Sequence, residues 1–289
     1  MRSLLLSVLL VLTTVLGSSL SGTLSAQTAN CKLLSWNIRD FGKTKSEAEI
    51  DLMAKILRGY DVIAIQEVVA KHPGGAKAVA RLTAALERTG ADYDYIVSDP
   101  TQSSSSHKRE RYAYIWRTST IKLIGRPHLL SAYAKTIERE PYFATFEWEG
   151  KAFNVVNLHA RPHDQQPEQE LSALKKLPEE FDDKPLFLVG DFNLKSKHSV
   201  FNPWLKRGYQ LAAVNQKTTL RKTLQKGQDG YSREKDNILI PVHQVQLLEG
   251  GSLDILAFLR NDIDAANALS DHVPVYVVFD DYPQLEKMK

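Results

Sequence analysis

Short apolar segments of strand length recur along this chain, and five of them run into, or start from, a polar side chain. The segment Leu33–Trp36 is followed by Asn37, for example, and Leu186–Gly190 is followed by Asp191. Because a sheet collects strand ends along one edge, these polar residues can converge on one cleft held by a rigid scaffold. The polar positions are Asn37, Glu67, His159, Asp191 with Asn193, and Asp271 with His272.

The segments between these strands indicate the rest of the architecture. A capping box at Ser46 and Glu49 predicts a helix that continues to Arg58. The segment Pro167–Glu180 has leucines at helical spacing and predicts one helix, whereas Leu253–Phe258 is predicted to be a strand. Many short strands with a few covering helices favour an α+β fold in which two packed sheets are flanked by helices.

The N-terminal segment has the composition of a secretory signal peptide. Arg2 precedes the apolar run Leu4–Leu16, and small and polar residues follow this run. The run is shorter than the roughly 20 residues that span a membrane. We therefore expect a signal peptide at residues 1–26, a single domain at residues 27–289, and a secreted protein, extracellular or periplasmic. A retained membrane anchor is the alternative.

The net charge and the cysteine content exclude little about partners but do limit how the chain is stabilised. The 289 residues carry a net charge of +3, so the total charge alone identifies no partner. Cys31 is the one cysteine, and an exported chain with one thiol forms no internal disulfide. Its stability must then come from core burial and any bound ions. We expect a monomer with no stable membrane association, and a buried thiol rather than a lipid-anchored Cys31.

Each polar strand end has an ordinary explanation when it is taken alone, because a Glu often ends a solvated strand and Asp and Asn favour turns. One site explains all five ends together. The residue types match phosphodiester hydrolysis, which needs an activated water, neutralised phosphate charge and a proton for the leaving oxygen. Glu67 and Asp271 offer hard oxygen ligands that suit Mg²⁺ or Mn²⁺. The two histidines, His159 and His272, can divide the proton transfers.

Seven stretches carry a pattern that spans nearly the whole chain after its N-terminal segment. They are Trp36–Lys45 (WNIRDFGKTK), Tyr60–Val68 (YDVIAIQEV), Glu110–Arg117 (ERYAYIWR), Arg139–Pro141 (REP), Asn157–Pro162 (NLHARP), Val189–Asn193 (VGDFN) and Ser270–Val275 (SDHVPV). With them the sequence resembles the endonuclease/exonuclease/phosphatase superfamily, most closely its deoxyribonuclease I branch. The resemblance implies a four-layer αββα sandwich of two mainly antiparallel sheets, and a metal-dependent endonuclease that cuts DNA to 5′-phosphate and 3′-hydroxyl ends, with RNA left open.

The resemblance also implies roles for individual residues. Glu67 would be the main metal ligand. The residues that complete the metal and phosphate site would be Asn37, Asp191, Asn193 and Asp271. His272 would be the general base, oriented by Asp236, and His159 would be the general acid, supported by Glu110. The contacts to DNA phosphates would come from Arg39, Arg111 and Arg139.

Some positions depart from the family pattern. The segment Ser131–Glu138 lacks a cysteine-bracketed acidic loop, and Lys195 stands where the family often has an acidic calcium ligand, so we expect no calcium dependence. Lys108 replaces an aromatic residue that often packs against the DNA sugar. Basic clusters around Lys108, after Asn193 and within the irregular segment Asn215–Lys235 predict nonspecific phosphate binding that weakens with salt.

Two other functions stay open at this point. The same superfamily core serves phosphodiesterases and phosphatases that act on lipid headgroups such as sphingomyelin or inositol phosphates. The predicted phosphate contacts at Arg39, Arg111 and Arg139 favour a polynucleotide instead. A non-enzymatic binding protein on a degenerate scaffold would lack at least one catalytic side chain, and every principal one is present in this sequence.

Overall fold

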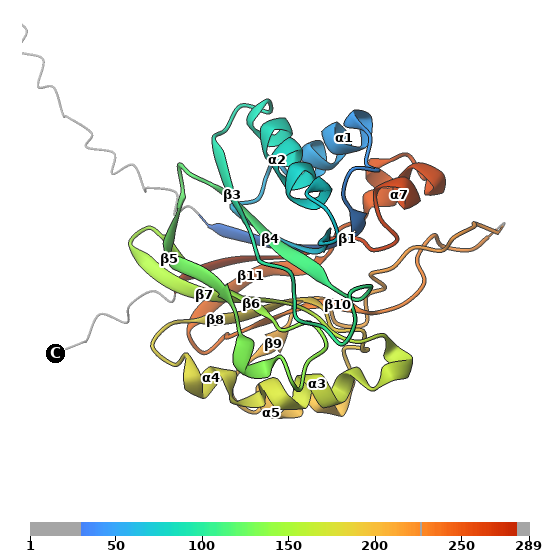
Figure 1. Ribbon diagram of the computed structural model, residues 1–289. Helices are drawn as coiled ribbons and strands as arrows, with labels where there is room; N and C mark the ends of the chain where they lie inside the picture. The colour runs from blue at the N-terminus through green and yellow to red at the C-terminus, as the bar shows by residue number, and fades with distance from the viewer. Residues whose placement is uncertain (1–29, 226, 282–289) are drawn as a thin grey trace, which may run out of the picture.

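A computed structural model describes residues 30–225 and 227–281 of the chain, and Figure 1 shows their four layers. Two six-stranded sheets pack face to face, and helices cover the outer face of each sheet. The predicted α+β sandwich is therefore confirmed. The predicted signal peptide lies outside the described residues. Among the described residues, no helix is long and apolar enough to cross a bilayer.

The first sheet has the strand order β11-β12-β1-β2-β4-β3. Its β1–β2 pair is parallel and its other pairs are antiparallel. The apolar sequence at the start of β2 is buried without interruption, because helices cover one face of this strand and the second sheet covers the other. The strands are β1 (Cys31–Phe41), β2 (Val62–Val69), β3 (Tyr93–Val97), β4 (Glu110–Arg117), β11 (Val245–Ser252) and β12 (Val275–Asp281).

The second sheet has the order β5-β6-β7-β8-β10-β9, and here the β7–β8 pair is the parallel one. The apolar segments Phe143–Trp148 and Phe153–Leu158 predict a hairpin that turns at Glu149-Gly150, and the β6–β7 hairpin turns there. Both turn residues have positive φ. The strands are β5 (Ile121–Leu129), β6 (Tyr142–Trp148), β7 (Lys151–His159), β8 (Leu186–Asp191), β9 (Gln210–Leu211) and β10 (Asp236–Ile240).

Each sheet carries its own set of helices. The first sheet is covered by α1 (Glu47–Leu57), α2 (Gly74–Glu87), α6 (Ile255–Phe258) and α7 (Ile263–Leu269). The second is covered by α3 (Pro167–Ala173), α4 (Leu177–Glu180) and α5 (Asn202–Leu205). The predicted capping box is present, because Ser46 accepts from the Glu49 amide and the Glu49 side chain accepts from the Ser46 amide. Short 3₁₀ turns lie at Ser131–Tyr133, His163–Gln165, Leu174–Lys176 and Ser199–Phe201.

Two predicted elements are wrong. Leu253–Phe258 is not a strand: Asp254 caps the short helix α6 by accepting from the Ala257 amide, and the neighbouring strand β11 ends at Ser252. A short apolar run has no period that separates strand from helix, and the cap decides here. The single helix predicted at Pro167–Glu180 is divided into α3, a 3₁₀ turn and α4. Its leucines are nevertheless buried as predicted.

The two sheets are joined by buried polar contacts as well as by apolar packing. The Gln66 side chain of β2 donates to Asn157 Oδ1 of β7 at 2.6 Å, and Asn157 donates to the Ile65 carbonyl at 3.1 Å. The Tyr114 hydroxyl of β4 donates to the Tyr142 carbonyl at 2.8 Å. These contacts fix the offset of one sheet against the other, directly beneath the strand ends that carry the polar residues.

Candidate active site

Strand register places three site residues in one row across the second sheet. His159 at the end of β7 pairs with Asp191 at the end of β8, and Asp191 pairs with Asp236 at the start of β10. Gly190 makes this row possible because it has a φ of +139° and a Cβ at that position would lie 1.9 Å from the Leu158 carbonyl oxygen. Asn37, Glu67 and Glu110 come from strands of the first sheet, Asp271 and His272 lie in the segment before β12, and Asn193 follows β8.

His159 forms an imidazole–carboxylate pair that crosses between the sheets. Its Nδ1 lies 2.9 and 3.0 Å from the two carboxylate oxygens of Glu110, which begins β4 in the first sheet. Burial lowers the pKa of His159, but the negative charge of Glu110 outweighs this, and the pKa is raised above its ordinary value. Because Nδ1 is engaged, Nε2 is the nitrogen left for chemistry.

His272 forms a second pair of the same kind, also across the sheets. Its Nδ1 lies 2.8 Å from Oδ2 of Asp236, and its backbone carbonyl accepts from Trp36 Nε1 at 2.9 Å. Burial opposes the imidazolium, yet Asp236 and Asp191 together raise the pKa of His272 to about 9. Burial raises the pKa of Asp236. The contact between Asp236 and His272 that the resemblance implies is therefore present in the structure.

Asp191 lies between the two imidazoles. Its Oδ2 is 3.6 Å from His159 Nε2 and 3.8 Å from His272 Nε2. Burial raises the pKa of this carboxyl, but the two histidines and Lys235 outweigh burial and lower the pKa below its usual range. The backbone amide of Asn193 donates to Asp191 Oδ1 at 2.8 Å, and this hydrogen bond orients the carboxylate toward the histidines. Two imidazoles therefore face one buried negative charge.

Side-chain oxygens that could coordinate a metal ion lie beside Asp191. Asn37 of β1 donates to Glu67 Oε1 at 3.0 Å and to Asp191 Oδ2 at 3.3 Å. Its own Oδ1 is buried without a hydrogen-bond partner. Glu67 has a φ of +60° at a register shift of β2, and such a bulge re-aims a side chain toward a site. Uncharged and charged oxygens at this point fit a hard divalent cation such as Mg²⁺ or Mn²⁺.

A second group could also hold a metal ion by distance alone. One ligand atom each of Asp191, Asp236 and His272 lie within 4.8 Å of one another. The hydrogen bond between His272 Nδ1 and Asp236 already engages two of these groups. The unpartnered Asn37 oxygen and the part-exposed Glu67 make the oxygen group the better cation site.

The three arginines that were predicted to contact DNA phosphates differ in their position relative to the site. Arg139 is largely enclosed, with 12% of its side chain exposed, and its Nε lies 3.0 Å from Glu110 Oε2. Arg39 lies 3.8 Å from Asp271 and donates to a carbonyl of α7, while Arg111 donates to the Ser98 carbonyl at 2.6 Å. Each guanidinium is thus engaged within the protein, at the edge of the site for Arg39 and beneath His159 for Arg139.

Sequence reasoning missed several supporting residues. Lys45 is buried, and its Nζ donates to the last two carbonyls of α7, Ala268 at 2.9 Å and Leu269 at 2.7 Å. The next residue, Ser270, donates to the Asn37 carbonyl at 2.7 Å and accepts from the His272 amide. The SDH motif contains Ser270, but nothing in the sequence indicates that a distant lysine holds this turn.

The segment Ser98–Lys108 is polar and rich in serine, so the sequence predicts an exposed loop, but the structure constrains this segment more than that. Glu140 is 1% exposed, and both of its oxygens accept from the Gln102 amide. Glu138 accepts from the amide and the hydroxyl of Ser104. Ser98 and Thr101 are buried, so the prediction of a wholly exposed loop is wrong at these positions. Buried carboxylates hold the loop in place close to Glu110.

The sandwich and its paired imidazoles define a class: phosphoester hydrolases with a polar site at one edge of two packed sheets. The endonuclease/exonuclease/phosphatase family model matches residues 34–272, and the chain belongs to this family. It is 29% identical to a deoxyribonuclease of Thioalkalivibrio sp. (strain K90mix), over 89% of this chain and 73% of that protein. It is 29% identical to Deoxyribonuclease-1 of Bos taurus, over 60% of this chain and 64% of that protein.

Structural comparison gives the same fold. A family member from Bacteroides thetaiotaomicron superposes with a TM-score of 0.62 and 17% identity, over 89% of this chain and 100% of that one. The family predicted from the sequence motifs is therefore confirmed, and with it a hydrolase similar to deoxyribonuclease I.

Proposed function

We propose that this protein is a secreted, divalent-metal-dependent endonuclease that hydrolyses DNA phosphodiester bonds with little sequence specificity, leaving 5′-phosphate and 3′-hydroxyl ends. The observation that carries the proposal is the pair of buried imidazole–carboxylate dyads facing Asp191. Proton removal from water and proton delivery to the leaving oxygen require two groups with opposite tasks. Both dyads leave one Nε2 free for such a transfer.

The dyads are assigned to the two tasks as follows. His272, held by Asp236, accepts a proton from the attacking water through Nε2. His159, held by Glu110, donates a proton from Nε2 to the 3′ oxygen as the bond to phosphorus breaks. Asn193, whose side chain is fixed by a 3.1 Å hydrogen bond to the Ala160 carbonyl, is placed to position a phosphate oxygen.

Glu67 and Asn37 are the residues that would hold the divalent cation, with Asp191 and Asp271 completing the set. When bound there, Mg²⁺ or Mn²⁺ supplies positive charge that neutralises the phosphate and lowers the pKa of His272 toward the range in which imidazole is a base. The unpartnered Oδ1 of Asn37 supports this placement.

DNA is the proposed substrate because the curated relatives are deoxyribonucleases and because basic side chains surround the cleft. A lipid headgroup presents a single phosphodiester, so its binding does not require basic side chains on several sides of the cleft. The large exposed apolar residues lie at scattered positions rather than in one membrane-facing patch: Tyr95, Ile124, Leu205, Val214, Leu224, Leu248 and Phe258.

The test uses purified mature protein, supercoiled plasmid and Mg²⁺ or Mn²⁺, with and without a chelator. We expect nicking that the chelator stops, and a fall of about 10²-fold or more in His159→Ala and in His272→Ala. His128→Ala is the matched control because His128 is an exposed histidine on β5. Cleavage that persists in both site variants would refute the mechanism. Parallel assays with RNA and sphingomyelin decide the substrate class, and N-terminal sequencing of exported protein tests a start near Gln27.

A further inference from the structure

The segment Ser232–Lys235, directly before Asp236, forms a ridge between two recesses at the active site. One recess of about 480 Å³ is lined by Asp271, His272 and part of the segment 219–228. The other, of about 680 Å³, is lined by Asn193 and by residues of the loop that follows it. Arg233 and Lys235 line both recesses. The ridge therefore borders the catalytic residues on two sides.

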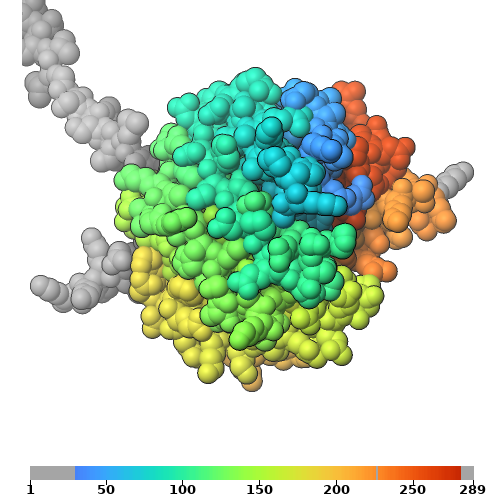
Figure 2. Space-filling model, in the orientation of Figure 1, coloured from blue at the N-terminus to red at the C-terminus, as the bar shows by residue number. Residues whose placement is uncertain are grey.

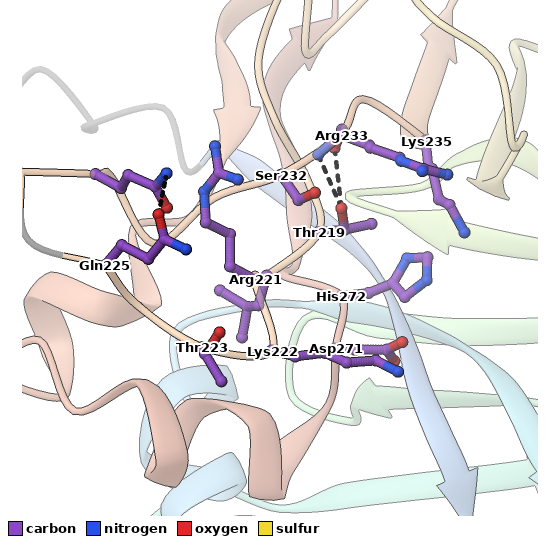
Figure 3. A pocket seen from close by; sticks show the side chains of 12 residues that line it. Thr219, Arg221, Lys222, Thr223, Gln225, Ser232, Arg233, Lys235, Asp271 and His272 are labelled. Atoms are coloured by element: carbon purple, nitrogen blue, oxygen red, sulfur yellow. Dashed lines mark hydrogen bonds between the residues drawn. The ribbon is translucent and has the colours of Figure 1, made fainter.

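The ridge presents two cations, on Arg233 and Lys235. Neither the Arg233 guanidinium nor the Lys235 ammonium makes a hydrogen bond or an ion pair with the described residues. In Figure 3 the Lys235 side chain extends toward the ring of His272, and Lys235 contributes to the pKa shifts of both His272 and Asp191. Arg233 is exposed and Lys235 is half-buried, so both can reach a bound anion.

Two other cations in this region, Lys217 and Arg221, are already paired with a carboxylate. Lys217 lies 2.7 Å from Asp229, and Arg221 lies 3.7 Å from the same carboxylate. Their segment projects from one side of the molecule, drawn in orange in Figure 2. These internal pairs stabilise the projecting segment, whereas Arg233 and Lys235 form no ion pair with the described residues. Among the described residues, Arg233 and Lys235 are the cations that line both recesses, and this position singles them out.

The backbone of the ridge is fixed before any ligand binds. The Arg233 amide donates to Thr219 Oγ1 at 2.9 Å, and the Lys235 amide donates to Thr218 Oγ1 at 3.0 Å. Between them Glu234 points the other way and accepts from the amide and hydroxyl of Ser196. A fixed backbone with outward cations binds an anion at a lower entropic cost than a mobile loop does.

We propose that Arg233 and Lys235 bind the phosphodiester backbone of the substrate strand on the His272 side of the scissile bond. The inference rests on the proposed function and adds its substrate class: a polynucleotide that extends beyond the bond being cut. A polynucleotide offers successive phosphates to such a ridge, while a small phosphodiester that fills only the catalytic centre does not reach Arg233.

The test compares Arg233→Gln, Lys235→Gln and the double variant with the wild type. The substrates are a duplex oligonucleotide over a series of NaCl concentrations and bis(p-nitrophenyl) phosphate at one concentration. Each lost phosphate contact makes the slope of log kcat/KM against log salt shallower by about 0.9. We therefore expect the double variant's slope to be shallower by about 1.8, with hydrolysis of the small diester unchanged in Arg233→Gln. Arg233→Lys should restore most of the slope.

The matched control removes two exposed lysines, Lys175 and Lys176, from the helical layer over the second sheet. It should keep the wild-type slope. A ridge variant with the wild-type slope, or an equal loss on both substrates in Arg233→Gln, overturns the inference while the proposed function stands. A wild-type protein that hydrolyses the small diester but no nucleic acid overturns the proposed function instead.

Discussion

The contact between Arg139 and Glu110 offers a sharp test of how the site is built. Both side chains are about nine-tenths enclosed, at 12% and 10% exposure, and the Glu110 carboxylate also holds His159. Removal of one member of a buried ion pair leaves an uncompensated charge and costs about 3–5 kcal/mol. We expect Arg139→Met and Glu110→Gln each to lower the free energy of unfolding by about 3 kcal/mol, the lower end, because His159 and nearby carbonyls remain as partners.

The double variant separates stability from catalysis. With both charges removed, its loss of unfolding free energy should be smaller than the sum of the two single losses by about 2–3 kcal/mol. Its activity should stay as low as that of Glu110→Gln, about 10²-fold below wild type, because His159 has lost the carboxylate that orients it. Urea denaturation and plasmid nicking measure the two quantities. Strictly additive destabilisation, or wild-type nicking by Glu110→Gln, would refute the reasoning.

Three further predictions concern the supports of the site. Lys45→Met removes the cation that caps α7 and should lower the free energy of unfolding by roughly 2 kcal/mol, measured by urea unfolding. It should also lower kcat more than it changes KM in steady-state kinetics. Gly190→Ala forces a Cβ against the Leu158 carbonyl and should cost about 2–5 kcal/mol; a variant with an unchanged melting temperature would contradict this. Burial opposes ionisation of Glu138, but the hydrogen bonds from Ser104 outweigh it and lower its pKa, so its stabilisation is present above the unfolded-state pKa and lost as pH falls. Glu138→Gln should therefore destabilise the protein at about pH 7 and have little effect at about pH 3, measured by urea unfolding at both.

The sequence predicted the parts of this protein that local pattern decides. Strand-length apolar runs located most of the central strands, and the capping box located the start of α1. The polar residue after each run was predictable for the same reason, since a strand's end is visible in the chain itself. Where local pattern was ambiguous the prediction was wrong, as at Leu253–Phe258, because a short apolar run fits a strand or a buried helix equally well.

The pairing of the imidazole and carboxylate side chains at the site was decided by the tertiary structure. His159 and Glu110 are 49 residues apart, His272 and Asp236 are 36 apart, and both pairs cross from one sheet to the other. No local pattern encodes the offset between two packed sheets, which the buried hydrogen bond from Gln66 to Asn157 helps to set.

The resemblance to the family predicted both imidazole–carboxylate contacts, and the packing of the sheets brings these side chains within hydrogen-bonding distance. The same packing encloses Arg139, which the sequence assigned to the substrate, and leaves the Arg233 and Lys235 side chains without a partner among residues 30–225 and 227–281. The sequence therefore determined which residue types stand at the strand ends. Only the fold decided which of their charges are neutralised inside the protein and which stay available to a ligand, because neutralisation depends on neighbours that are distant in the chain.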